Sequence, residues 1–255
     1  MIFFMQKNCF KSIIFSIFAE KKKYMEAKNI AILRFEENLG ASNIRCFRGA
    51  IIDMVGKEQA FFHNHEAGGL RYGYPLIQYK SIGGHACLVG IADAALSVMQ
   101  LVDKFPCSLK IGKKEMEFHV LDCRLVPYFP KMEDAPKLYH LKDYIALTED
   151  NFKKYHSLLA LTDKVNFLEQ IIIGNILSFL KGIDYHAQER IECAITEMKE
   201  PTEKFYKHVK FDTFDLMFVS NIELPDAIAL GKSGSVGFGT LTREELPERF
   251  KNINQ

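Results

Sequence analysis

Residues 74–89, YPLIQYKSIGGHACLV, have the pattern of two strands joined by a tight turn. Apolar and aromatic residues dominate 74–82, and a second apolar run occupies 85–89. Only Gly83 and Gly84 separate the two runs. Two-residue hairpin turns need positive φ angles, which glycine adopts without steric cost. The stretch therefore predicts an antiparallel β-hairpin.

On the N-terminal side of this hairpin, alternating apolar residues predict a strand over 29–35. A helix over 44–55 should follow it, with Ser42 or Asn43 as the N-cap and Gly56 as a left-handed stop. Its apolar residues recur at helical spacing, at Ile44, Phe47, Ile51 and Val55.

On the C-terminal side, a second helix is expected over 92–103, followed by a strand over 115–125 whose apolar and polar residues alternate. The resulting order is strand, helix, strand, strand, helix, strand. That order is typical of a ferredoxin-like unit.

Residues 126–137 contain three prolines and lack strand or helix periodicity, so we expect the domain boundary there. The predicted domains are 28–126 and 137–255. In the second, helices are expected over 148–158 and 162–182, and strands over 191–198, 213–219 and 226–230. A second, less regular ferredoxin-like unit is the simplest interpretation. The predicted fold class is α+β, with two tandem ferredoxin-like (RRM-like) domains.

Composition indicates an ordinary globular protein of 255 residues, with 48% apolar and 25% charged residues and a net charge of +1. A polyanionic partner would therefore have to bind a local basic patch. The six cysteines are scattered, without a Cys-x-x-Cys pair or zinc-ligand spacing. This usage favours a reducing, cytoplasmic location.

Residues 1–27 form an apolar leader that raises the possibility of a signal peptide or a membrane anchor. Lys7 and Lys11 interrupt the apolar run, which is too short to span a bilayer, and no small-residue cleavage site follows. We therefore favour a start at Met25, which would leave residues 1–24 untranslated, and we expect no membrane association.

The segment 61–80 gathers side chains that transfer protons and bind anions, and it contains His63, His65, Arg71, Tyr72 and Lys80. On extended backbone, residues two apart project to the same side, with Cα atoms roughly 7 Å apart. Histidine titrates near neutrality, so one imidazole can accept a proton while the other donates one. The two histidines could therefore serve one reaction centre.

Cleavage of RNA by its own 2′-hydroxyl needs such a pair, with a base on the nucleophile and an acid on the departing 5′-oxygen. It also needs cations or donors at the phosphorane oxygens, which Arg71, Tyr72 or Lys80 could supply, and it needs no metal. Other roles stay open, because a His-x-His pair also serves as a loop decoration, a cap or a pair of metal ligands.

A second notable segment is Gly231-Lys232-Ser233-Gly234-Ser235-Val236-Gly237-Phe238-Gly239. Repeated glycines let backbone N–H groups approach an anion, and the lysine and serines add a charge and hydroxyl donors. The segment lacks the residue order of a Walker loop or a dinucleotide fold. It predicts a phosphate cradle, although such glycine-rich turns are also common as plain structure.

Together these features resemble the CRISPR-associated endoribonucleases that cut precursor CRISPR RNA within its repeats, in the subtype with a His-Asn-His run. The resemblance spans most of 25–240 and lies in these segments: 47–51 (FRGAI), 62–65 (FHNH), 71–80 (RYGYPLIQYK), 89–91 (VGI) and 232–240 (KSGSVGFGT).

The resemblance implies two tandem ferredoxin-like domains, a basic cleft for CRISPR repeat RNA, and metal-independent cleavage without a cofactor that leaves 2′,3′-cyclic phosphate and 5′-hydroxyl ends. It makes His63 and His65 the acid and base candidates and Tyr72 an assisting residue. The expected RNA contacts are Arg71, Lys80, Gly231, Lys232, Ser233, Gly234, Ser235, Gly237 and Gly239. Retention of the product, a homodimer on the RNA and other CRISPR-associated proteins as partners are compatible with this interpretation. The leading alternative is a non-catalytic RNA-binding subunit of a CRISPR effector complex, and a metal-dependent phosphodiesterase that uses the His-x-His pair is the third option.

Overall fold

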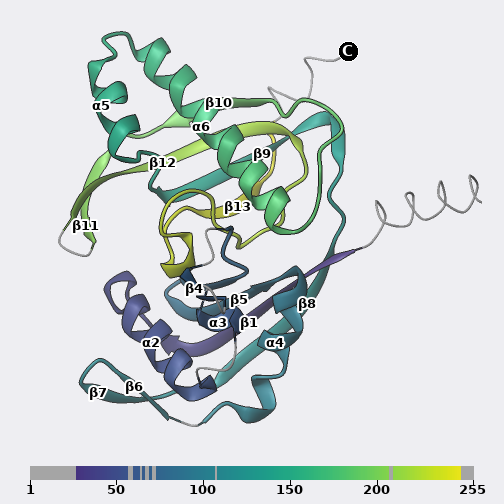
Figure 1. Ribbon diagram of the computed structural model, residues 1–255, viewed down its shortest axis with the longest axis vertical. Helices are drawn as coiled ribbons and strands as arrows, with labels where there is room; N and C mark the ends of the chain where they lie inside the picture. Colours follow the sequence, from purple (N-terminus) through teal and green to yellow (C-terminus); the bar gives the residue numbers. More distant parts are fainter. Residues whose placement is uncertain are drawn as a thin grey trace, which may run out of the picture.

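A computed structural model describes residues 27–56, 60–63, 65–66, 69–70, 73–106, 108–206 and 209–247. They form two sheets that lie one above the other in Figure 1, each with helices of its own. The predicted α+β class with two ferredoxin-like units is confirmed. The remaining residues, including the leader 1–26, lie outside the described part of the chain.

The first sheet has the strand order β4-β5-β1-β8, antiparallel throughout. Along the chain, β1, β4, β5 and β8 are the first to fourth strands of this sheet. Their spatial order is therefore 2-3-1-4, which is that of a ferredoxin-like unit. The strands are β1 (Lys28–Asn38), β4 (Ile77–Ile82), β5 (His85–Ile91) and β8 (Val120–Tyr128). Gly83 and Gly84 have φ angles of 62° and 90°, so the predicted two-residue hairpin turn is confirmed.

The helices of the first domain are α2 (Ile44–Val55), the single turn α3 (Ala60–His63) and α4 (Ala95–Met99), with 3₁₀ turns η1 (Ala41–Asn43), η2 (Ala92–Ala94) and η3 (Val102–Lys104). Short strands β2 (His65–Glu66) and β3 (Gly69–Leu70) pair with each other, as do β6 (Ser108–Ile111) and β7 (Lys114–Glu117). The buried face of α2 follows its apolar spacing, and Phe47 stacks on Phe118 with ring centroids 5.5 Å apart.

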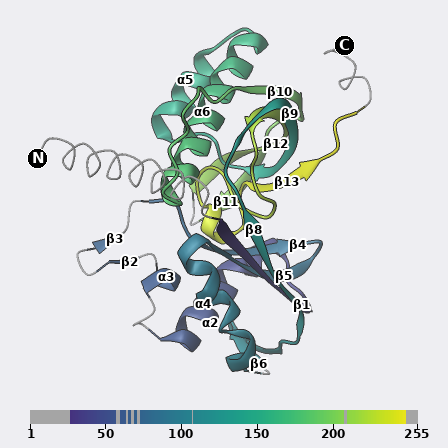
Figure 2. The same ribbon diagram turned by 90° about the vertical axis from the view of Figure 1, so that its right-hand side faces the viewer.

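The second sheet has the order β10-β12-β9-β13, with β11 paired to β12. Its strands are β9 (Met132–Tyr144), β10 (Cys193–Met198), β11 (Thr202–Tyr206), β12 (Val209–Ile222) and β13 (Thr240–Glu244). Helices α5 (Glu149–Ser157) and α6 (Leu161–Gly182) were predicted correctly, and α6 buries Leu168, Ile172, Ile176 and Phe179. Figure 2 shows both helices on one side of this sheet.

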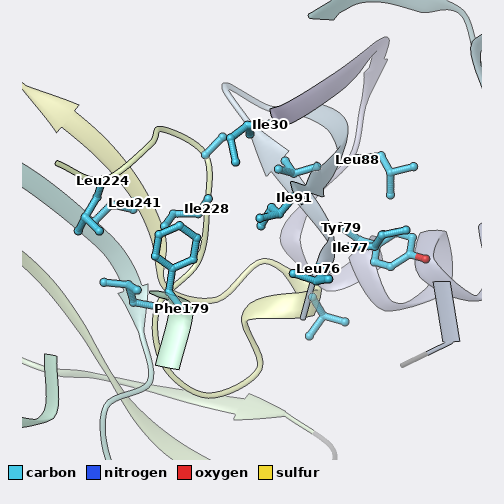
Figure 3. Close-up of a cluster of buried hydrophobic side chains, with 14 of the residues drawn as sticks. Ile30, Leu76, Ile77, Tyr79, Leu88, Ile91, Phe179, Leu224, Ile228 and Leu241 are labelled. Carbon is cyan, nitrogen blue, oxygen red and sulfur yellow. The ribbon is translucent and has the colours of Figure 1, made fainter. Parts of the chain in front are cut away.

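The two domains share one apolar core. Ile30 and Ile91 of the first domain belong to the same buried cluster as Ile228 and Leu241 of the second, and Figure 3 shows all four. Tyr74 is wedged at this boundary, where its ring packs on Phe179 at 5.1 Å and its hydroxyl donates to the carbonyl of residue 229 at 2.8 Å. A rigid junction between the sheets follows from this packing.

Four sequence-based predictions of secondary structure were wrong in detail. The helix expected over 92–103 contains only Ala95–Met99 as α-helix, because Ala92 has a φ of 50° and both ends are 3₁₀ turns. The strand expected over 115–125 is two strands, since Gly112, with a φ of 64°, lets β7 turn back on β6 instead of joining the sheet.

The proline-rich segment 126–137 lies mostly in strands instead of a linker. Pro127 is accommodated because β8 is an edge strand, and Pro136 lies beside a register shift in the β9–β12 pairing. The strand expected over 226–230 is reduced to one isolated bridge at Ala229, because Ala227 has a φ of 65°.

Candidate functional site

In chain order, the segment between β12 and β13 corresponds to the connection that contains α4 in the first domain. Both sheets have the same strand order, but residues 223–239 contain only the 3₁₀ turn η4 (Gly234–Val236) where a second helix would be expected. This segment packs on the first domain. A Cβ on Gly237 would lie 3.5 Å from the Tyr79 carbonyl oxygen and 3.8 Å from the Cα of Lys80. The glycine-rich residues 231–239, called the glycine segment below, therefore join the two domains.

Close packing explains why this segment is rich in glycine. A Cβ on Gly231 would overlap the ring of Tyr144, and one on Gly239 would overlap the carbonyl of Leu230. Both glycines also have positive φ angles, of 84° and 62°. A Cβ on Gly234 would lie only 2.7 Å from that of Ala229. The glycines permit contacts that no other residue allows.

Several backbone N–H groups of the segment already have partners within the protein. The amides that donate to carbonyls are those of Lys232 (to Ile145), Val236 (to Ser233), Gly237 (to Gly234) and Gly239 (to Asp143). These amides are therefore not available to a phosphate in this conformation. A phosphate cradle of the kind expected from the sequence would have to use the other amides of the segment and its side chains.

Among the side chains of the segment, Lys232 is exposed, and its Nζ lies 4.8 Å from the centroid of the Phe211 ring. Ser233 has a left-handed φ of 60°, and both Ser233 and Ser235 are half-buried. The expected contacts of these residues with RNA stay predictions.

A cleft of about 920 Å³ lies between the domains, beside the glycine segment. The first domain contributes the start of α2 and the β4–β5 turn. The second contributes β9, β11, β13 and the glycine segment. Polar, cationic and aromatic residues of its lining are Ser42, Arg45, Ser81, His140, Lys142, Asp143, Lys204, Phe205, Phe238, Thr240 and Thr242.

Two exposed cations line this cleft from opposite domains, Arg45 on α2 and Lys142 on β9. Among the residues that the structure describes, neither takes part in a salt bridge. Lys204 differs, because its Nζ lies 2.6 Å from Asp143 Oδ1 and its charge is largely compensated. Arg45 and Lys142 are therefore the cations best placed to meet an anion in the cleft.

His140 also lines the cleft, and its Nε2 lies 2.5 Å from Asp215 Oδ1. Lys199 Nζ approaches the other oxygen of the same carboxylate at 3.3 Å. Burial acts to raise the pKa of Asp215, but the bonds from His140 and Lys199 outweigh it and hold this pKa below its ordinary value. Asp215 is therefore an anionic partner that fixes the orientation of the His140 ring.

Lys80 lies directly beneath this region and is completely buried, with 0% of its surface exposed. Its Nζ donates to Thr240 Oγ1 at 3.1 Å, which ties β4 to β13 across the domain boundary. Burial lowers the pKa of Lys80 from 10.5 to about 7. Lys80 has no exposed surface in this conformation, and its expected contact with RNA stays a prediction.

The remaining predicted residues lie outside the described part of the chain or at its edges. His63 ends α3 and His65 begins β2, where it pairs with Leu70, and the structure describes their backbone only. The helical backbone at His63 contradicts the assumption that both histidines lie on one extended stretch. Alternation therefore does not set their spacing. Arg71 and Tyr72 lie outside the described residues.

Sequence reasoning missed most of the cleft. His140 and Lys142 lie on β9, whose prolines hid the strand, and Phe205 lies on β11, which was not predicted. The signal that could have found Phe205 is an aromatic pair, Phe205 and Tyr206, set between Lys204 and Lys207. Interleaved basic and aromatic residues are typical of single-stranded nucleic-acid binding.

Two further findings concern the described residues alone. The described cysteines, Cys46, Cys87, Cys123 and Cys193, are free thiols. In the same ranges, no helix combines the length and the apolar character that crossing a bilayer demands.

Comparisons with known proteins agree with this architecture. Residues 26–125 match the family model of the Cas6b N-terminal domain, and residues 131–244 match that of the Cas6b C-terminal domain. The uncharacterized protein MJ0978 of Methanocaldococcus jannaschii is 34% identical over 117 residues, which are 46% of this chain and 78% of that protein.

Two solved structures share the fold. One, described as the crystal structure of Cas6b, has a TM-score of 0.76 and 23% identity, and the match covers 85% of this chain and 100% of that one. The other, a CRISPR RNA processing endoribonuclease Cas6b, has a TM-score of 0.67 and 20% identity over 86% of this chain and 100% of its own.

Proposed function

Because this chain belongs to the Cas6b family, we propose that it is an endoribonuclease that cuts precursor CRISPR RNA within its repeats. The observation that carries the proposal is the cleft between the two domains, with an exposed cation on each side that forms no salt bridge with a described residue. A solved structure with the same fold is named as a CRISPR RNA processing endoribonuclease, which supports this substrate.

The proposed reaction uses the 2′-hydroxyl of the RNA as the nucleophile. Its oxygen bonds to the adjacent phosphorus, the bond from phosphorus to the 5′-oxygen breaks, and the products carry a 2′,3′-cyclic phosphate and a 5′-hydroxyl. One of His63 and His65 removes the proton of the 2′-hydroxyl, and the other protonates the departing 5′-oxygen. Tyr72 assists this proton transfer, and Arg71 stabilises charge on the phosphorane. The charge changes fall on these side chains and need neither a metal nor a cofactor.

The RNA is proposed to lie in the cleft, where Arg45 and Lys142 bind its phosphates. Lys232 and the serines of the glycine segment extend this contact at its edge. Lys80 supports the site by holding β4 against β13 through its hydrogen bond to Thr240. A cytoplasmic location, retention of the cut RNA, a homodimer on the RNA and binding to other CRISPR-associated proteins belong to the same proposal.

The first experiment is a cleavage assay in EDTA with an end-labelled repeat RNA from the source genome. A matched RNA carries a 2′-deoxy substitution at the mapped cut. We expect the unmodified RNA to be cut, with a cyclic phosphate at its new end, and the substituted RNA to stay intact. Loss of activity in EDTA would overturn the metal-independent mechanism, and tight binding without cleavage would favour the non-catalytic RNA-binding subunit.

Two histidine variants separate catalysis from binding. His65→Ala should lose cleavage, typically by 10²- to 10⁴-fold for a general acid or base, while RNA affinity changes little. His156→Ala is the matched control, because His156 lies on α5, bonded to Asp212 at 2.8 Å and outside the cleft lining. Equal losses of binding and cleavage in His65→Ala would argue against a catalytic role.

A further inference from the structure

Phe205 is a large apolar side chain that the fold leaves in water, with 76% of its surface exposed. It lies on β11 and lines the cleft between the domains. Single exposed apolar residues are common, but of the large apolar side chains exposed among the described residues, Phe205 is the one that lines the cleft.

Its exposure is not a consequence of a loosely held strand. β11 pairs with β12 along its whole length, with Phe205 opposite Lys210. The Thr213 hydroxyl donates to the Thr202 carbonyl at 2.9 Å, and Lys204 ties the strand to Asp143 of β9 at 2.6 Å. Phe205 is therefore presented to the cleft from a fixed backbone.

The neighbourhood of Phe205 fits nucleic acid better than protein. Arg45 and Lys142 line the same cleft as exposed cations without a salt bridge among the described residues. A cationic groove that follows phosphates, with an aromatic ring on its wall, is the arrangement that binds single-stranded nucleic acid. An apolar protein partner would bury these two charges without supplying counter-charges, which is energetically costly.

We propose that Phe205 stacks on an unpaired base of the RNA in the cleft, so that this part of the substrate is single-stranded. The inference rests on the proposed function and deepens it, because it states which form of the repeat the second domain recognises. A base pair inside a helix would not satisfy Phe205, since both of its faces are already covered by neighbouring pairs. Every base has an aromatic face, so the contact selects strandedness more than sequence.

Binding of the repeat RNA by variants tests the contact. Phe205→Ala should weaken binding about 5- to 150-fold, the usual range for one base–aromatic stack. Phe205→Leu should lose as much affinity, because leucine has no ring, even though it keeps most of the apolar area. Phe205→Tyr keeps the ring and should bind like the wild type. Phe152→Ala is the matched control, since Phe152 is also exposed, at 43%, but lies on α5 outside the cleft lining.

Salt dependence separates stacking from phosphate binding. Phe205→Ala should keep the wild-type slope of log K against log salt, because it removes no charge. Lys142→Ala should reduce that slope by about 0.7, the value for one phosphate contact on a single strand. A reduced slope in Phe205→Ala would show that the variant disturbs the cationic groove and would overturn the assignment.

A fluorescent base in the RNA shows which nucleotide Phe205 contacts, and in the wild type it does so without any substitution in the protein. 2-Aminopurine placed in turn at each unpaired position of the repeat should be quenched at one position by the wild type and not by Phe205→Leu. If no position responds to Phe205, or if Phe205→Ala binds and cleaves like the wild type, the stacking proposal fails while the proposed function stands. If the wild type neither binds nor cuts the repeat RNA, the proposed function fails with it.

Discussion

Lys80→Met is the substitution whose effect the structure specifies most closely. Lys80 is fully buried, and burial lowers its pKa from 10.5 to about 7, while its Nζ has a hydrogen bond to Thr240. In the unfolded chain the same group keeps its ordinary pKa. Lys80 therefore makes its own contribution to the pH dependence of folding stability. Methionine has a similar length and no charge, so Lys80→Met removes that contribution.

The sign follows from proton counts. Between pH 7 and 10.5 the unfolded chain carries a proton on Lys80 that the folded chain lacks, so the free energy of unfolding rises with pH. Below pH 7 both states are protonated, and the full cost of burying the charge persists. With these two pKa values, the contribution between pH 6 and pH 8 amounts to about 1.4 kcal/mol.

Urea unfolding at pH 6, 7 and 8 measures this contribution. The stability of the wild type relative to Lys80→Met should increase by about 1.4 kcal/mol over that range. The comparison cancels the titration of histidines that both proteins share. Lys153→Met is the control, because the Lys153 side chain is 74% exposed and should give no such trend. Parallel profiles for the wild type and Lys80→Met would refute the reasoning.

Three more predictions concern the boundary between the domains and the glycine segment. Phe179→Ala should lower the free energy of unfolding by about 3–5 kcal/mol in denaturant titrations, since the ring is fully buried against Tyr74. Gly182→Ala should destabilise by about 1–3 kcal/mol because its Cβ would lie 2.6 Å from that of Tyr74, whereas Gly174→Ala on the same helix, with nothing within 4 Å, should stabilise by about 0.5–1 kcal/mol. Lys232→Ala should weaken RNA binding and flatten its salt dependence; an unchanged salt slope would remove Lys232 from the RNA path.

The first domain could be predicted from sequence because its signals are local. Gly83 and Gly84 define a two-residue turn, and the apolar spacing of 44–55 defines a helix. Its errors arose where tertiary contacts override a local pattern. The amide of His119 donates to Glu37 at 2.9 Å, which breaks the apparent strand over 115–125 between β7 and β8.

The cleft could not be predicted because it is assembled from distant parts of the chain. Arg45, Lys142 and Phe205 meet only when the second sheet docks on the first, and no spacing in the sequence encodes that docking. The glycine segment was recognised as unusual for a valid reason. Its glycines, however, are accounted for by contacts with Tyr144, Ala229 and Leu230, which a sequence motif does not display.

The position of the glycine segment also limits which recombination events between related genes can give a folded protein. By sequence it belongs to the second domain, yet it fills the boundary against β4 and α2 of the first. An exchange of halves between diverged relatives would set Gly237 against a foreign strand and Tyr74 against a foreign segment in place of the one that contains Ala229. Selection must therefore keep the two halves together, so that substitutions on one side of the boundary are compensated on the other.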